Sequence, residues 1–233
     1  MLFGIIKYIN AYKFGNIFNL YMQRIGIIGS GDVGQSLALG FLKLGFEVRI
    51  GTREPDKLAK WLDNAGAKAS VSSFKDAARF GDILILCTKW IGTENAIKLS
   101  DKDNFKGKIV IDVTNPLVFL KDIPELDIAY PNSGGLKIQR MLPDSKVVKA
   151  FNTVTAKYMC NPKLEEGVPD LFIAGNDDES KEIVKGFAEQ FGWNVTDIGN
   201  IEQSYLLEAL AMLWIRYGFL NNHWMHAFKL LKK

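Results

Sequence analysis

Residues 24 to 45 read RIGIIGSGDVGQSLALGFLKLG, and this stretch predicts a strand, a glycine-rich turn and a helix in succession. The strand runs from Arg24 to Ile28 and is almost wholly apolar. The helix carries apolar residues at helical spacing from Leu37 to Leu44. Gly45 suits the end of that helix because glycine readily adopts the left-handed conformation. This order of elements is typical of the first part of a βαβ unit.

The turn matches the pattern G-x-G-x-x-G and lies between the expected strand and the expected helix. The first glycine permits the tight turn, the second lets the backbone approach a pyrophosphate, and the third allows close packing of the helix on the strand. The helix N-terminus adds unpaired N–H groups that attract an anion. The alternative is a turn with a purely structural role. The motif predicts dinucleotide binding through Gly29, Ser30, Gly31, Val33 and Gly34.

The remainder of the chain keeps the same alternation of short apolar runs and longer amphipathic ones, which favours a mostly parallel sheet. We therefore expect a Rossmann-type, doubly wound α/β fold with a small C-terminal α/β and helical extension. Helices are expected at Asp178 to Phe191 and at Gln203 to Leu220. The expected strands are Arg24 to Ile28, Phe46 to Ile50, Lys68 to Val71, Ile83 to Cys87, Ile109 to Val113, Lys146 to Phe151, Leu171 to Ala174 and Trp193 to Ile198.

The length and composition limit the number of domains and the class of protein. The 233 residues, 26.1 kDa in mass, have room for one sizeable core and not for a second full domain. We expect an N-terminal extension over 1–21, a dinucleotide-binding domain over 22–155 and a small C-terminal part over 156–233. With 48% hydrophobic residues, 24% charged residues and a mean hydropathy of +0.01, the composition excludes a disordered, collagen-like or coiled-coil chain.

Charge and cysteine content exclude several classes of function. The net charge is +3, and no run of lysine or arginine between the two ends would serve as a nucleic-acid stripe. Only two cysteines, Cys87 and Cys160, are present, which argues against a disulfide scaffold and favours a reducing, cytoplasmic environment. His223 and His226 lie three residues apart without a neighbouring cysteine or carboxylate, so no metal site is expected.

Residues 1 to 21 hold six aromatic residues and no acidic residue. Lys7 and Lys13 interrupt the apolar run, which leaves it short of the ~20 residues that span a bilayer. We interpret this segment as a loosely held extension that precedes Met22. The alternative is a helix that binds a membrane surface or a partner.

The segment from Gln203 to Leu220 is apolar on almost every side, with Glu208 and Arg216 as its only charges. These two charges make it a poor membrane span. A helix that is apolar all round has to be buried, either in its own core or against another subunit. A homodimer is therefore a hypothesis for this chain.

The end of the second expected strand indicates which dinucleotide is bound. An acidic residue there would receive the free 2′-hydroxyl of NAD, but the chain reads Gly51-Thr52-Arg53. Thr52 offers a hydroxyl donor, Arg53 a planar fork for a phosphate, and Lys57 a further positive charge. This pattern favours NADP over NAD. The alternative is that Arg53 pairs on the surface with nearby Glu54 and Asp56.

Further contacts are expected from the ends of the fourth and fifth strands, because ligands of open α/β sheets lie at the carboxyl ends of the strands. Thr88, Trp90, Asn115 and Pro116 follow these strands and offer hydrogen-bonding groups and a rigid turn near the nicotinamide. Each could equally be part of an ordinary loop. Cys87 is interpreted as a small buried hydrophobic residue and not as a nucleophile.

The motifs above, together with Thr114-Asn115-Pro116-Leu117 and the run from Leu142 to Thr153, resemble the NADPH-dependent coenzyme F420 reductase family. The same motifs occur in the cytosolic domains of membrane metalloreductases. The likeness covers Arg24 to Lys233. It implies an NADP domain and a short C-terminal part that closes over a deazaflavin or flavin (coenzyme F420, FMN or FAD) and builds a dimer.

The resemblance also implies roles for individual residues. The NADP positions fall on the glycine motif and on Thr52, Arg53, Lys57, Thr88, Trp90, Asn115 and Pro116, and the acceptor side on Asn152, Thr153, Val154 and Leu207. One departure stands out, because the chain reads Ser133-Gly134-Gly135-Leu136 where the family usually has a carboxylate after its Ser-x-Ala.

Hydride transfer between two ring cofactors needs little acid–base equipment, which agrees with the absence of a recognisable catalytic set. Two alternatives remain open at this point. Lys149 and Asn152 resemble the lysine and asparagine of β-hydroxyacid dehydrogenases, although the chain lacks their long helical domain. The second alternative is an NADP(H)-binding redox sensor that signals through a dimer surface.

Overall fold

The computed structural model describes residues 24–120 and 122–231, and residues 1–23, 121, 232 and 233 lie outside this description. The expectation for the segment 1–21 therefore falls outside the described residues. Within them, none of the helices is both long enough and apolar enough to cross a membrane.

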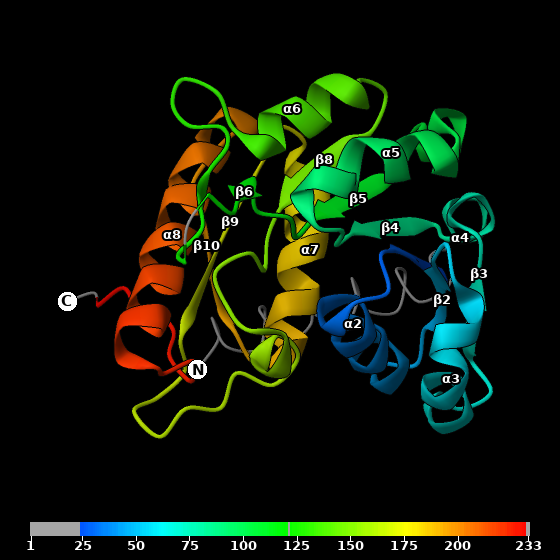
Figure 1. The fold of residues 1–233 in the computed structure, drawn as a ribbon, viewed down its shortest axis with the longest axis horizontal. Helices are drawn as coiled ribbons and strands as arrows, with labels where there is room; N and C mark the ends of the chain where they lie inside the picture. Colours follow the sequence, from blue (N-terminus) through cyan, green and yellow to red (C-terminus); the bar gives the residue numbers. More distant parts are fainter. Residues whose placement is uncertain (1–23, 121, 232–233) are drawn as a thin grey trace, which may run out of the picture.

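One eight-stranded sheet organises the described residues, in the order β10-β9-β8-β5-β4-β1-β2-β3 (Figure 1). All neighbouring strands run parallel except β8 and β9, which are antiparallel. A separate two-stranded hairpin, β6 with β7, was not expected from the sequence. The strands are β1 (Arg24–Ile28), β2 (Glu47–Gly51), β3 (Ala69–Ser72), β4 (Ile83–Leu86), β5 (Ile109–Asp112), β6 (Leu117–Val118), β7 (Glu125–Leu126), β8 (Lys146–Lys149), β9 (Asp170–Gly175) and β10 (Asn194–Asp197).

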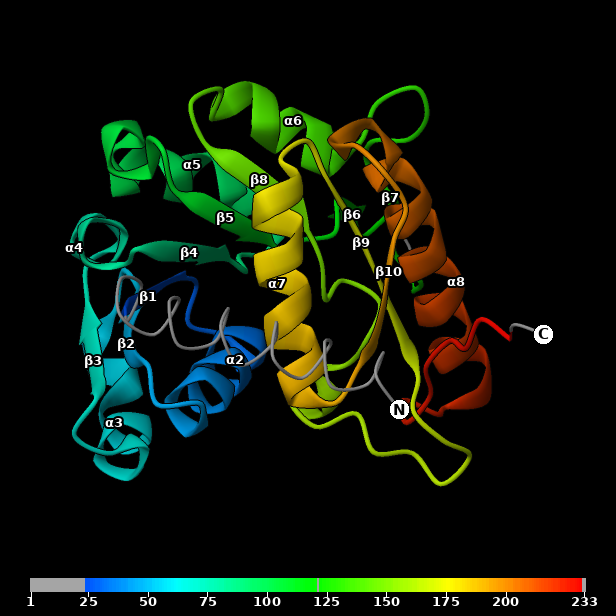
Figure 2. The same ribbon diagram turned by 180° about the vertical axis from the view of Figure 1, so that it is seen from behind.

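Helices cover both faces of this sheet, as a parallel sheet requires. Figure 2 shows α7 in front of the sheet, next to the strands β8 to β10 that it contacts. The α-helices are α2 (Asp32–Lys43), α3 (Ala59–Ala65), α4 (Phe74–Phe80), α5 (Trp90–Ser100), α6 (Gly134–Met141), α7 (Asp178–Phe191) and α8 (Ser204–Asn221). The 3₁₀ turns are η1 (Pro55–Leu58), η2 (Lys102–Phe105), η3 (Ala156–Tyr158) and η4 (Ile201–Gln203).

Two hydrophobic cores form because successive strand residues point to opposite faces of the sheet. Ile83 and Ile85 of β4 join the core beneath α2 and α7. In this core the Phe41 and Phe187 rings pack edge to face, with 5.1 Å between the ring centroids. Leu84 and Leu86 join the core beneath α4, α5 and α6. The expected doubly wound α/β fold is confirmed.

The chain reverses its direction of winding between β1 and β4, which lie side by side at the centre of the sheet. The strands β1, β2 and β3 build outward on one side of this point, and β4, β5 and β8 build outward on the other. The carboxyl ends of β1, β2, β4, β5 and β8 therefore meet along one edge. Ligands of open α/β sheets lie at such an edge, close to the point of reversal.

Strand β8 ends at Lys149, two residues earlier than the sequence pattern indicates. The cause lies in Phe151, whose φ of 58° is left-handed and outside the range of a strand. A left-handed phenylalanine is unusual because its Cβ crowds the following carbonyl. The chain turns sharply there, and the residues after Lys149 leave the sheet for the carboxyl edge.

Helix α8 lies at the outer edge of the molecule (Figure 1), and it begins and ends one residue later than the sequence pattern indicates. Its inner face is buried against its neighbours, including α6 and β9. Its outer face is apolar and exposed, with Leu206 at 46%, Leu213 at 59%, Tyr217 at 48% and Leu220 at 67% exposure. The helix is therefore apolar all round but buried on one side only within this chain.

The contact between α2 and the chain around Cys160 leaves no room for an extra methyl group. A Cβ added at Gly40 would lie 2.2 Å from Cys160 Sγ and 2.7 Å from Cys160 Cβ. We expect Gly40→Ala to lower the free energy of unfolding by about 1–3 kcal/mol, the usual cost of overpacking a core. Denaturant unfolding of the purified protein measures this change.

Gly186 in the interior of α7 is the matched control, because a Cβ added there meets nothing within 4 Å. Gly186→Ala should raise the free energy of unfolding by about 0.5–1 kcal/mol, since alanine loses less backbone entropy than glycine in a helix. Equal changes in the two variants would contradict the packing described for α2.

Candidate functional site

The glycine turn after β1 has the close contacts that its motif demands. Gly29 has a φ of 132°, and a Cβ added there would lie 2.8 Å from the carbonyl oxygen of Cys87. A Cβ added at Gly34 would lie 2.2 Å from the carbonyl oxygen of Gly29. Helix α2 therefore packs on the turn at a distance that only glycine allows, and the turn lies against the end of β4.

The middle of the same turn is open. A Cβ added at Gly31 would meet nothing within 4 Å, and no side chain caps the N-terminus of α2 there. The first N–H groups of a helix lack partners within the helix, and the helix dipole makes this end positive. Val33 is half-buried and packs against the core, which fixes the first turn of α2. The arrangement fits a pyrophosphate on the N–H groups around Gly31.

The end of β2 is joined to the glycine turn by hydroxyl groups. Thr52 is buried, and its Oγ1 accepts hydrogen bonds from Ser30 Oγ at 3.0 Å and from the Glu54 N–H at 3.2 Å. The Gly29 N–H donates to the Gly51 carbonyl oxygen at 3.2 Å. These bonds hold the first residues after β1 and β2 side by side, as a nucleotide that bridges the two strands requires.

Arg53 is exposed, and its side chain has no ion pair in the part of the chain that the structure describes. The sequence left open whether Arg53 pairs with Glu54 or Asp56, but Lys57 is the residue that pairs with Glu54. A hydrogen bond and the charge of Lys57 lower the pKa of Glu54. Arg53 is thus available for a ligand, whereas Lys57 would have to leave an exposed ion pair.

Thr88 lies in the loop after β4, and Trp90 is the first residue of α5. Thr88 Oγ1 and Thr93 Oγ1 lie 2.8 Å apart in a hydrogen bond, and Trp90 Nε1 donates to Asp127 Oδ2 at 2.9 Å. Both residues are half-buried and orient the start of α5. Cys87 donates weakly to the carbonyl oxygens of Ile28 and Gly29, and burial raises the pKa of its thiol to about 12. Cys87 is therefore no nucleophile at neutral pH.

Asn115 after β5 and Asn152 after β8 face each other. Asn115 Nδ2 donates to the Asn152 carbonyl oxygen at 2.8 Å, and Asn152 Nδ2 donates to Asn115 Oδ1 at 3.0 Å. Asn152 Nδ2 also donates to the carbonyl oxygen of Leu207 in α8 at 2.9 Å. Asn152 Oδ1 is buried without a hydrogen-bond partner among the described residues. Such an atom is costly to leave unpaired and marks a place for a ligand donor or a water.

The side chains of the other residues expected on the acceptor side are buried in the protein. Thr153, Val154 and Leu207 are all less than 10% exposed, at 6%, 7% and 2%, and Val154 belongs to the core beneath α2. Pro116 is buried, and a Cβ added at Gly134 would lie 3.3 Å from its ring carbons. Hydrogen bonds thus link Asn115, Asn152 and Leu207 to one another. Thr153 and Val154 are buried next to Asn152 in the chain.

A buried charge cluster at this edge was missed by sequence reasoning, which considered Lys149 but gave neither Asp112 nor Glu208 a place in the site. Lys149 Nζ lies 2.9 Å from Asp112 Oδ2 and 3.0 Å from Glu208 Oε1, and all three side chains are at most 1% exposed. Glu208 also accepts from the N–H groups of Gly134 and Gly135, each at 2.9 Å. The segment from Ser133 to Leu136 has no carboxylate of its own, but Glu208 of α8 places a carboxylate against it. The sequence did offer a signal for this cluster, because Asp112 and Glu208 are each the single acidic residue within an apolar run.

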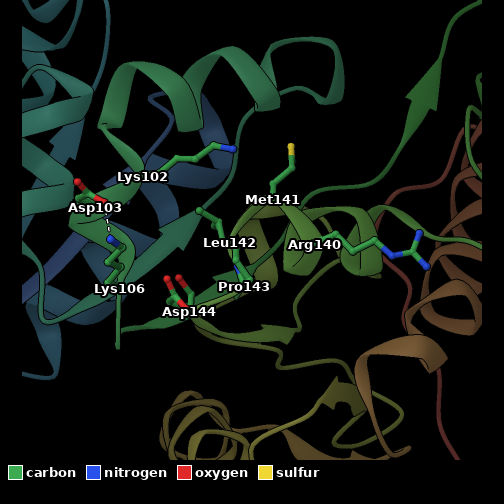
Figure 3. Close-up of a pocket in the computed structure, with 9 residues that line it drawn as sticks. Lys102, Asp103, Lys106, Arg140, Met141, Leu142, Pro143 and Asp144 are labelled. Carbon is green, nitrogen blue, oxygen red and sulfur yellow. Dashed lines mark ion pairs between the residues drawn. The ribbon is translucent and has the colours of Figure 1, made fainter.

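A cavity of about 390 Å³ lies away from this edge (Figure 3). Its walls come from the residues that precede β5 and β8, so it lies at the amino ends of those strands. Lys106 in its wall pairs with Asp103 at 2.8 Å. None of the residues expected to bind a dinucleotide lines it. The lining residues are Lys102, Asp103, Lys106, Arg140, Met141, Leu142, Pro143, Asp144 and Ser145.

Comparisons with known proteins identify the family of this chain. Residues 24–116 match the family described as NADP oxidoreductase, coenzyme F420-dependent. The F420-dependent NADP reductase of Methanocaldococcus jannaschii is 34% identical over 210 residues, which cover 83% of this chain and 91% of that relative. A crystal structure from Arthrobacter sp. FB24, provisionally assigned as an F420-dependent NADP reductase, is 31% identical with a TM-score of 0.85. It covers 91% of this chain and 100% of its own.

Human metalloreductase STEAP2 is 27% identical over 190 residues, and the chain spans only 36% of the length of that relative. The match therefore concerns one part of a larger protein. The relatives that the match covers over nearly their whole length are F420-dependent NADP reductases, the family that the sequence motifs resemble. This chain belongs to the family of F420-dependent NADP reductases.

Proposed function

We propose that this chain, an NADP-dependent oxidoreductase by its family, transfers a hydride between NADP(H) and coenzyme F420. The observation that carries the proposal is the 34% identity to an F420-dependent NADP reductase over 91% of the length of that relative. In the direction of F420 reduction, NADPH loses a hydride and becomes NADP⁺, and the deazaflavin ring takes up the hydride and one proton. The two cofactors supply this chemistry, and the protein binds them, orients them and excludes water.

The geometry around the glycine turn supports NADP(H) as the first ligand. The open backbone at Gly31 and the uncapped start of α2 would hold the pyrophosphate. Thr52, Arg53 and Lys57 would hold the 2′-phosphate, and no carboxylate stands at the end of β2 to receive a free hydroxyl. The further NADP contacts that we propose are Gly29, Ser30, Val33, Gly34, Thr88, Trp90, Asn115 and Pro116.

We assign residues 22–155 to NADP and residues 156–233 to the acceptor and to assembly. The hydrogen bond from Asn152 to Leu207 joins the two parts, so the last residues of the first part can contribute to the acceptor side together with α8. Asn152, Thr153, Val154 and Leu207 would form the wall behind the acceptor. Asn152 Oδ1 is the one of these groups with an unmet hydrogen-bonding requirement, so we expect it to accept from a ligand N–H.

The role of Arg53 predicts a difference between two cofactors. Arg53→Gln should weaken NADPH binding by about 10- to 100-fold, because a hydrogen bond to a charged group contributes roughly 1.5–3 kcal/mol. NADH, which lacks the 2′-phosphate, should lose little affinity. Fluorescence titration of both cofactors measures the two Kd values. Arg216→Gln, a change at an exposed arginine of α8, serves as the control, and equal losses for NADPH and NADH would refute the assignment.

The acceptor is tested by following NADPH oxidation with coenzyme F420, FMN and FAD in parallel. We expect rapid oxidation with F420 and little with the two flavins. Faster oxidation with a flavin would make the protein a flavin reductase. If NADPH binds but none of these acceptors accelerates its oxidation, the result favours the redox sensor. Arg53→Gln in the same assay should raise the KM for NADPH more than it lowers kcat, because the phosphate contact exists before and during the reaction.

A homodimer is part of the proposal because α8 leaves an apolar stripe exposed. Leu206, Leu213 and Leu220 recur at seven-residue spacing with Tyr217 beside them, so they lie on one side of the helix. The same stripe on a second copy would pair with it about a twofold axis. We expect sedimentation at micromolar concentration to give twice the mass of the chain, and Leu213→Glu to give the monomer. A wild-type monomer would contradict the dimer.

A further inference from the structure

The side chain of Lys149 is sealed inside the protein at the carboxyl edge of the sheet. Its Nζ donates to Asp112 Oδ2 at 2.9 Å, to the carbonyl oxygen of Thr114, and to Glu208 Oε1 at 3.0 Å. A lysine ammonium has three N–H groups, so every donor of Lys149 is used inside the protein. Four segments meet at this one nitrogen: the ends of β5 and β8, the loop after β5, and α8.

The charge of Lys149 is maintained by its partners. Burial pushes the pKa of Lys149 down, but the charges of Asp112 and Glu208 and their hydrogen bonds outweigh burial, so the pKa is raised. Lys149 therefore stays protonated at neutral pH, and no described contact links it to Asn152. This arrangement does not fit the proton-transfer role of the lysine in β-hydroxyacid dehydrogenases. Lys149 acts through what its contacts hold in place.

The first thing that these contacts hold is the loop that presents Asn115. Asp112 Oδ1 accepts from the Thr114 N–H at 2.9 Å and from Thr114 Oγ1 at 2.7 Å, while Lys149 binds the Thr114 carbonyl oxygen. Thr114 is thus bound at its N–H, its carbonyl and its side chain. Asn115, the next residue, has little freedom left in its position.

The second thing is the turn that presents Asn152. This turn starts at Lys149, passes through the left-handed Phe151 and brings Asn152 back toward Asn115. A left-handed bulky residue persists only where its surroundings determine its conformation. Lys149 holds the start of the turn, and the bond from Asn152 Nδ2 to the Leu207 carbonyl oxygen holds its end. Leu207 and Glu208 are adjacent in α8, so both ends of the turn depend on the same turn of that helix.

We propose that Lys149 is a positioning residue for hydride transfer, which fixes the Asn115 and Asn152 pair through its contacts with Asp112, Thr114 and Glu208. The inference rests on the proposed function, which assigns this pair to the nicotinamide and acceptor side. Its consequence is that NADPH binds normally without Lys149, because the phosphate contacts lie at β1 and β2. The nicotinamide ring, however, loses its defined orientation.

The test compares wild type with Lys149→Met, which keeps the length of the side chain and removes its charge and donors. Single-turnover hydride transfer to F420 should slow by about 10- to 100-fold, since a misplacement of about 1 Å can cost roughly 100-fold in rate. The Kd for NADPH should stay within about threefold, because the two steps use different contacts. The fluorescence emission of bound NADPH should move toward that of free NADPH. An unchanged rate would overturn the proposal.

A double-variant comparison separates positioning from a general loss of stability. If Lys149 acts through Asn152, then Asn152→Ala should cost much less in rate in the Lys149→Met background than in wild type, since coupled residues are not additive. Losses that simply multiply would overturn the proposal. Lys181→Met is the matched control. Lys181 is also largely buried, at 8% side-chain exposure, and pairs with Asp178 and Asp197 in α7 and β10, and its loss should change neither the rate nor the emission.

Glu208→Gln provides the same comparison if Lys149→Met fails to fold, because it keeps the shape of the side chain and removes one charge. We expect a smaller loss of rate and the same coupling to Asn152→Ala.

The proposed function and the proposed role of Lys149 fail in different ways. If wild type transfers no hydride to F420, the proposed function fails, and the emission of bound NADPH then decides the role of Lys149. An emission that is identical in wild type, Lys149→Met and Glu208→Gln would refute it.

Discussion

A lysine ammonium that is closed off from water constrains the whole carboxyl edge of this sheet. Moving a charge out of water costs several kcal/mol even after relaxation, and the cost is offset only by well-placed partners. Lys149 has three, on β5, the following loop and α8, and Glu208 in turn binds the first two N–H groups of α6. Removing Lys149 would cost roughly 3–5 kcal/mol, because the carboxylates of Asp112 and Glu208 would remain buried without a cation. The last helix of the chain is thereby an integral part of the site.

The charges at the end of the edge that we assign to NADP are of a different kind. Arg53 is exposed, and Lys57 forms an exposed pair with Glu54 that has 75% and 56% of its side chains in solvent. Exposed pairs of this kind contribute between about 0 and 1 kcal/mol, so a ligand phosphate competes with them at little cost. In our proposal, the buried cluster fixes the geometry of the site, and the exposed cations bind the phosphate of the ligand. The two roles need opposite degrees of burial, and they are found at opposite ends of the edge.

The fold was largely predictable because its determinants are local. Alternating apolar runs and the glycine turn indicate the strands, and residue spacing alone indicates α7 with both of its ends. The end of β8 was not predictable, because the left-handed Phe151 is imposed by contacts from distant parts of the chain. The antiparallel direction of β9 and the hairpin of β6 with β7 likewise depend on where the chain returns in space. Asp112 and Glu208 were missed for the same reason, since 96 residues of sequence separate them.

The left-handed turn at Phe151 connects the Asn115 and Asn152 pair to core packing in this protein. A backbone that its own residue disfavours stores about 1–3 kcal/mol and keeps its shape only while its neighbours hold it. The ring of Phe151 packs against that of Phe191, with 6.1 Å between the ring centroids. Phe191 belongs to α7, a helix outside the candidate site. The direction in which Asn152 points is therefore set partly by the packing beneath α7. Under the proposed role of Asn152, repacking that core changes the rate of hydride transfer as well as the stability, so stabilised variants have to be selected by rate and not by melting temperature alone.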